Sequence, residues 1–213
     1  MSALFALTCA LGTAATLFGD RRGSVALAAG GKIAASASFL AFAVASGVPE
    51  RAPHGVAMMV ALVLSAVGDV ALIGKSKPAF LAGLSAFLLA HLAYAWVSVT
   101  LDPAPLWSGL AAVPVLAVAG GVWRWLRGHV GRLAVPVLAY IAAITAMVVL
   151  AAGVGAHGEP AHALLVASAV LFFVSDIFVA RQRFVAPGFI NRALGLPLYF
   201  AAQLGFVVAA AGI

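Results

Sequence analysis

Residues 133–153 read LAVPVLAYIAAITAMVVLAAG, a run of 21 residues without a charged side chain. A helix of this length rises about 30 Å, which is the thickness of the hydrocarbon core of a bilayer. The whole chain has the same character, because 65% of its 213 residues are hydrophobic and only 8% are charged. Soluble domains are about 45–50% apolar and about 25% charged. The sequence therefore predicts an integral membrane protein.

Seven further apolar runs lie along the chain, separated by short polar or proline-containing stretches. The predicted all-α bundle of eight transmembrane helices covers residues 3–18, 25–47, 55–74, 79–99, 105–123, 133–153, 161–180 and 193–212. The first run begins at Ala3 with no basic segment before it, which favours a membrane span over a cleaved signal peptide. No shift in composition marks a linker, so we expect a single transmembrane domain over residues 1–213.

The basic residues are distributed very unevenly between the two sides of this bundle. The odd-numbered connections carry ten of the twelve, namely Arg21, Arg22, Lys75, Lys77, Arg124, Arg127, Arg132, Arg181, Arg183 and Arg192. The even-numbered connections carry only Arg51, and Lys32 lies inside the second span. The positive-inside rule then predicts a protein of the cell inner (plasma) membrane with both termini on the non-cytoplasmic side. No basic patch is interleaved with aromatic residues, so we expect no nucleic-acid partner.

Two acidic motifs lie inside predicted spans, where a charge costs at least about 2.5–3.5 kcal/mol. The third span contains LSAVGD at residues 64–69, and the seventh contains FFVSD at residues 172–176. Asp69 and Asp176 are 107 residues apart, and each precedes a basic connection by five or six residues. This spacing suggests a weak internal repeat, and it places both acids roughly 7–9 Å inside the cytoplasmic boundary. We expect one shared polar site.

Further polar side chains are expected near these acids. Lys32 and Tyr199 lie at a similar depth, while His91 and Gln203 lie somewhat deeper. His91 and Tyr94 share one helix face, as do Tyr199 and Gln203, because residues three or four apart are neighbours on a helix. The pattern predicts that all these groups line one cavity open to the cytoplasmic half.

Structural explanations stay open for each group. Lys32 could extend toward the headgroups, and the two acids could pair with basic residues of the connections. His91, the two tyrosines and Gln203 could serve as hydrogen-bonding contacts between helices.

At these positions the chain resembles the YhhN family of membrane proteins, which includes the lysoplasmalogenases. The resemblance covers essentially the whole chain and rests on six motifs in the same order. They are Lys32-Ile33, Gly68-Asp69, Gly83-Leu84-Ser85-Ala86-Phe87, His91 with Tyr94, Ser175-Asp176 and Leu198-Tyr199-Phe200-Ala201-Ala202-Gln203. Ile33 stands where the family usually has proline, a departure that affects local helix geometry.

The resemblance implies an ether hydrolase that cleaves the vinyl ether of a lysoplasmalogen to a fatty aldehyde and glycerophosphocholine or glycerophosphoethanolamine. Protonation of the alkene carbon gives an oxocarbenium ion that water captures, and glycoside hydrolases solve a similar problem with two carboxyl groups. One of Asp69 and Asp176 would serve as the acid and the other as the carboxylate that stabilises the cation. The predicted catalytic residues are Asp69, Asp176, His91 and Tyr199. The predicted substrate-binding residues are Lys32, Tyr94, Gln203 and Ser175.

In this scheme Lys32 keeps one acid ionised or binds the lipid phosphate, and no metal or cofactor is required. The expected partners are the lysophospholipid substrate and the bilayer. A proton-coupled transporter of lipids or small molecules is one alternative, because buried Asp and His also form proton relays. A structural partner without catalysis is a second alternative. A hydrolase of the same fold that acts on another ether lipid or lysolipid is the closest competitor.

Overall fold

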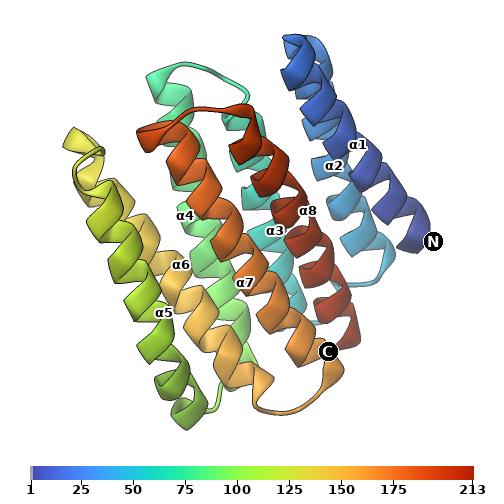
Figure 1. Ribbon diagram of the computed structural model, residues 1–213. Helices are drawn as coiled ribbons and strands as arrows, with labels where there is room; N and C mark the ends of the chain where they lie inside the picture. Colours follow the sequence, from blue (N-terminus) through green and yellow to red (C-terminus); the bar gives the residue numbers. More distant parts are fainter. Residues whose placement is uncertain (1) are drawn as a thin grey trace.

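The structure is a computed structural model that describes residues 2–213 and consists of eight long helices joined by short connections (Figure 1). The helices are α1 Ser2–Arg22, α2 Val25–Ala45, α3 His54–Ala71, α4 Lys77–Thr100, α5 Pro105–Leu126, α6 Ala134–Gly155, α7 Pro160–Ala180 and α8 Phe189–Gly212. A 3-10 turn, η1 Gly131–Leu133, precedes α6, and a π-helical turn, η2 Arg181–Val185, extends α7. Eight helices of the described chain are long and apolar enough to cross a membrane. This confirms the predicted all-α class and the number of spans.

The charged ends of four helices extend beyond the predicted spans. Asp20, Arg21 and Arg22 lie in the last turn of α1, Lys77 begins α4, Arg124 lies in the last turn of α5, and Arg192 lies in the first turn of α8. The apolar pattern predicts all six residues in connections, and this is wrong. Apolar residues end where the hydrocarbon core ends, whereas a helix can continue through the polar headgroup region.

The neighbour relations of the first four helices recur in the last four. Helices α1 and α2 pack together, as do α5 and α6, and α3 packs on α4 as α7 packs on α8. Across the two halves, α2 packs on α8 and α6 packs on α4. Figure 1 shows α1 and α5 at opposite edges of the bundle, with α4 and α8 between them. This arrangement is the one expected from the 107-residue spacing of the two acids.

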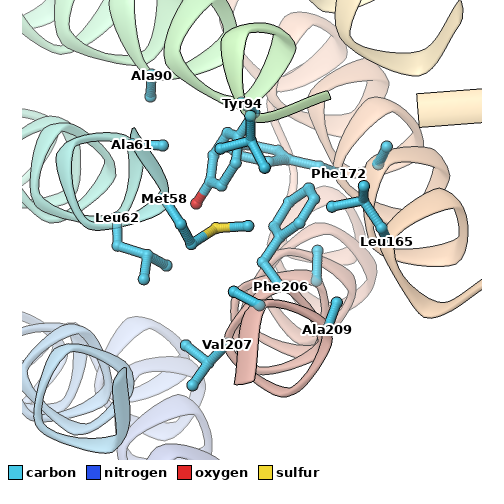
Figure 2. Packing of buried hydrophobic residues seen from close by; sticks show 14 of the residues in the cluster. Met58, Ala61, Leu62, Ala90, Tyr94, Leu165, Phe172, Phe206, Val207 and Ala209 are labelled. Carbon is cyan, nitrogen blue, oxygen red and sulfur yellow. The ribbon is translucent and has the colours of Figure 1, made fainter. Parts of the chain in front are cut away.

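Aromatic side chains fill the centre of the bundle between α4, α7 and α8. Figure 2 shows Tyr94, Phe172 and Phe206 gathered there. The rings of Tyr94 and Phe206 are stacked with their centroids 4.1 Å apart, and Phe172 is fully buried. Such pairs add about 0.5–1.5 kcal/mol beyond the burial of their area. The aromatic core therefore fixes how α4 and α8 are rotated toward each other.

Gly68, the residue just before Asp69, allows the aromatic ring of Phe87 to pack closely against α3. A methyl group at Gly68 would lie 2.7 Å from ring carbons of Phe87. Phe87 is 7% exposed, and its ring packs edge-on against Tyr199. The small residue just before Asp69 is thus required by packing between α3 and α4.

We therefore expect Gly68→Ala to lower the free energy of unfolding by about 1–3 kcal/mol, because the buried ring of Phe87 must move to admit the methyl group. Thermal unfolding of the purified protein in detergent measures this loss. Gly120→Ala is the matched control, since a methyl group at Gly120 of α5 would meet nothing within 4 Å. If both variants unfold at the wild-type temperature, this glycine is not required for packing.

Candidate active site

A cavity of about 340 Å³ lies among the helices and contains both predicted acids. Asp69 reaches it from α3 and Asp176 from α7, together with Lys32 of α2, Tyr140 of α6 and Tyr199 of α8. The cavity extends to the end of the bundle where α3 meets α4 and α7 meets α8, because the exposed residues Lys75 and Arg183 also line it. We call this end, which carries the odd-numbered connections, the basic end. Two motifs far apart in the sequence therefore meet in one space.

The carboxylate of Asp69 is buried and engaged on both of its oxygens. Its Oδ1 lies 3.1 Å from Nζ of Lys32. Its Oδ2 accepts hydrogen bonds from the hydroxyls of Ser36 at 2.7 Å and Tyr199 at 2.6 Å. A buried charge is tolerated only when it is paired and hydrogen-bonded. Asp69 is therefore held as an anion by one cation and two neutral donors.

Lys32 lies inside the bundle at this ion pair. The residue is 8% exposed, so it does not extend to the headgroups. The partner of Asp69 is thus a residue of a membrane span and not one of the basic connections.

Asp176 has a different environment. The hydroxyl of Tyr140 donates to its Oδ2 at 2.7 Å, and Nε2 of His91 lies 3.4 Å from the same oxygen without making a hydrogen bond. Within the described chain, no Lys or Arg forms an ion pair with Asp176. Its side chain is 14% exposed, against 2% for Asp69. Asp176 is thus the more accessible carboxyl group, and a phenol and an imidazole are its polar neighbours.

The two carboxyl groups occupy matching positions in the two halves of the chain. Lys32, Asp69 and His91 precede Tyr140, Asp176 and Tyr199, respectively, by 107 or 108 residues. Each acid has a polar neighbour from the other half, Tyr199 for Asp69 and His91 for Asp176. The halves differ in charge, since the position filled by Lys32 in one half is filled by Tyr140 in the other. The two halves of the chain therefore place polar residues at matching positions, but only the first half places a cation beside its acid.

Three of the predicted site residues lie outside the cavity. His91, Tyr94 and Gln203 are fully buried between helices and do not line it. The hydroxyl of Tyr94 donates to Oε1 of Gln203 at 2.5 Å, a link between α4 and α8. The prediction that every polar group lines one cavity is therefore wrong for these three. Helical spacing shows which residues share a face, but it does not show whether that face meets a cavity or another helix.

Ser175 and His91 touch the site in a more limited way than expected. Ser175 lines the cavity, but its hydroxyl donates to the carbonyl of Phe172 at 2.8 Å, within its own helix. His91 approaches the cavity only through Asp176.

Two contacts of the acids come from residues that the sequence did not single out, Tyr140 and Ser36. Tyr140 precedes Asp176 by 36 residues, and Lys32 precedes Asp69 by 37, so extending the repeat to the second and sixth spans would have found it. Ser36 lies four residues after Lys32 and thus on the same helix face.

Away from the polar residues at the basic end, the remaining walls of the cavity are mostly apolar. They include Val122 and Leu126 of α5 and Val137, Ile141 and Ile144 of α6. Within residues 2–213, no group of three His, Cys, Asp or Glu side chains could hold a metal ion. Two carboxyl groups, one fixed as an anion and one beside neutral groups, can carry out acid–base chemistry on an apolar ligand.

The fold and the cavity define a multi-pass membrane protein with two carboxyl groups in one cavity between its helices. The chain belongs to the YhhN family, whose family model matches residues 27–210. This confirms the resemblance read from the six motifs.

The chain is similar to several relatives that carry the name lysoplasmalogenase. One from Mycobacterium bovis is 35% identical over 158 residues, covering 71% of this chain and 58% of the relative. Lysoplasmalogenase TMEM86A of Bos taurus is 31% identical over 167 residues, covering 71% and 64%. Lysoplasmalogenase TMEM86B of Homo sapiens is 33% identical over 144 residues, covering 68% and 58%. The chain thus spans less than two thirds of the length of each of these relatives. No solved structure matches this chain.

Proposed function

We propose that this protein is a lysoplasmalogenase, which hydrolyses the vinyl ether of a lysoplasmalogen to a fatty aldehyde and glycerophosphocholine or glycerophosphoethanolamine. The observation that carries the proposal is the pair of carboxyl groups, Asp69 and Asp176, in one cavity with apolar walls. The names of the relatives support the choice of substrate.

Asp176 is the proposed general acid. It has no Lys or Arg partner in the described chain and is the more exposed of the two carboxyl groups. Its proton goes to the alkene carbon next to the alkyl chain, and the alkene electron pair forms the new C–H bond. The carbon attached to the ether oxygen becomes an oxocarbenium centre. Water adds to this centre and gives up a proton to Asp176, and the resulting hemiacetal collapses to aldehyde and alcohol.

Asp69 is the proposed carboxylate that stabilises the cation and orients the water. Lys32, Ser36 and Tyr199 hold it as an anion, so its negative charge is already in place when the positive charge develops. Preorganised charge of this kind is usually the largest contribution to catalysis. His91 is a positioning residue in this scheme, because it reaches the reacting atoms only through Asp176. Tyr94 and Gln203 fix α4 against α8.

Apolar residues of α5 and α6 line one side of the cavity, from Leu126 and Val137 at the basic end to Ile144 deeper in the bundle. This side would accept the alkenyl chain. We also propose that the basic end faces the cytoplasm and that both termini lie on the opposite side of the inner (plasma) membrane. The positive-inside rule supports this orientation.

The direct test is aldehyde release by the purified protein from a lysoplasmalogen in deuterated water. We expect one deuterium on the carbon next to the aldehyde group, because solvent supplies the proton that the acid delivers. Product aldehyde kept in deuterated water without enzyme measures background exchange. The matching 1-alkyl lysolipid, which has no alkene to protonate, should stay intact. If a folded protein releases no aldehyde, the vinyl ether is not its substrate. The alternatives are then hydrolysis of another lysolipid or a transport function.

A further inference from the structure

Four cationic side chains line the cavity, and only two of them have an acidic partner. Lys32 is paired with Asp69 at 3.1 Å, and Nε of Arg192 lies 2.8 Å from Oδ2 of Asp20. The other two, Lys75 and Arg183, form no ion pair with any residue of the described chain. Both are exposed at the basic end. At the basic end, the charge of Arg192 is therefore compensated, whereas the charges of Lys75 and Arg183 are not, and Lys32, the cation deeper inside, is balanced by Asp69.

Arg183 is held in place by an aromatic ring. Its guanidinium lies 4.2 Å from the centroid of Phe80, which is 8% exposed and lines the same cavity. The ring of Phe184 packs edge-on against the ring of Phe80, with the two centroids 5.9 Å apart. A guanidinium stacked on a ring keeps its N–H edge free to bind an oxyanion in a planar, bidentate geometry. Arg183 is thus oriented before any ligand arrives.

Each of the two cations follows one of the acids by a similar number of residues. Lys75 follows Asp69 by six residues, and Arg183 follows Asp176 by seven. Asp69 lies two residues before the end of α3, and Asp176 lies four before the end of α7, so each acid is within roughly 3–6 Å of the helix end that leads to its cation. In a lysolipid, the three glycerol carbons separate the phosphate from the ether oxygen. A phosphate at the mouth therefore leaves the vinyl ether at the level of the carboxyl groups.

We propose that Lys75 and Arg183 form a binding site for the phosphate group of the lysolipid, which sets how deeply the vinyl ether enters the cavity. This assignment rests on the proposed function and names the residues that bind the phosphate of its substrate. Lys32 is not the phosphate ligand, because it is buried in the bundle and paired with Asp69 at 3.1 Å. Free inorganic phosphate and the headgroups of the surrounding bilayer offer the same chemistry, so the test has to separate them.

The test measures binding without turnover. The ligands are a 1-alkyl lysophosphatidylcholine and the 1-alkylglycerol of the same chain length, which lacks phosphate, added to the purified protein in uncharged detergent. We expect Arg183→Gln and Lys75→Gln each to weaken binding of the phosphorylated ligand roughly fivefold to tenfold, the size of one charged hydrogen bond near solvent. Binding of the 1-alkylglycerol should not change. Lys77→Gln is the matched control, because Lys77 lies two residues from Lys75 but does not line the cavity.

Competitors identify the source of the phosphate. Glycerophosphocholine should displace the phosphorylated ligand better than inorganic phosphate does if the site recognises the headgroup of a lysolipid. Equal displacement by inorganic phosphate would overturn the lipid assignment. Unchanged binding in both variants, or an equal loss for the ligand without phosphate, would overturn the site itself. If the site behaves as expected but the wild type releases no aldehyde, the phosphate site stands and the hydrolase proposal fails.

Discussion

Asp176→Asn is expected to lower aldehyde release by a factor of about 10²–10⁴, the usual contribution of a general acid. The asparagine has the same shape but has no acidic proton to transfer to the alkene carbon. The hydroxyl of Tyr140, which donates to Asp176 at 2.7 Å, can donate equally well to the amide oxygen. The variant should therefore fold and bind the 1-alkyl lysolipid like the wild type. The measurement is the initial rate of aldehyde release, together with the unfolding temperature in detergent.

Glu159→Gln is the matched control for this experiment. Glu159 is an exposed acid that precedes α7 at the end away from the basic connections, so its loss should leave the rate unchanged. An Asp176→Asn protein that retains activity within threefold of the wild type would show that Asp176 is not the acid. If Asp69→Asn instead abolishes the reaction under the same conditions, the roles of the two carboxyl groups are exchanged.

Lys32→Met is expected to lower the free energy of unfolding by about 3–5 kcal/mol, because it leaves the buried carboxylate of Asp69 without its cation. The methionine has nearly the same length and is apolar, so it introduces no steric clash. Two neutral hydroxyl donors remain on Asp69, from Ser36 and Tyr199, but they do not balance a charge. Thermal or denaturant unfolding in detergent measures the loss.

The double variant Lys32→Met, Asp69→Asn separates loss of the pair from loss of the lysine alone. Removing both charges should restore most of the stability, because no unpaired buried charge remains. Lys77→Met, a change of the same kind at an exposed position, should have little effect. If the single and double variants are equally unstable, Lys32 stabilises the protein by packing, and Asp69 is not held as an anion.

Much of the fold could be predicted from the sequence. The number of spans follows from the length of the apolar runs, since only a helix satisfies its own backbone groups in the bilayer. The selection of Asp69 and Asp176 as candidate site residues follows from the cost of placing a charge at membrane depth. Both are local properties of one segment in its solvent. They do not depend on which other helix lies nearby.

The partners of the polar groups depend on how the helices pack against one another. A span can rotate about its axis and choose its neighbours without any change in its hydropathy. Packing of aromatic side chains and glycines, as between Phe87 and Gly68, sets that rotation. It turns His91, Tyr94 and Gln203 between helices and brings Tyr140 into the cavity beside Asp176.

The different environments of the two acids show most clearly what helix packing adds to the information in the sequence. The amino-acid sequence alone predicts eight helices that are long and apolar enough to cross a membrane, and an acid in each half at nearly the same place. It treated the two acids alike, since each stands before a basic connection. Only the folded bundle places Lys32 on one carboxyl group and Tyr140 on the other. The reason is that the charge of a neighbour acts through distance, and distance between spans is set by how the helices pack.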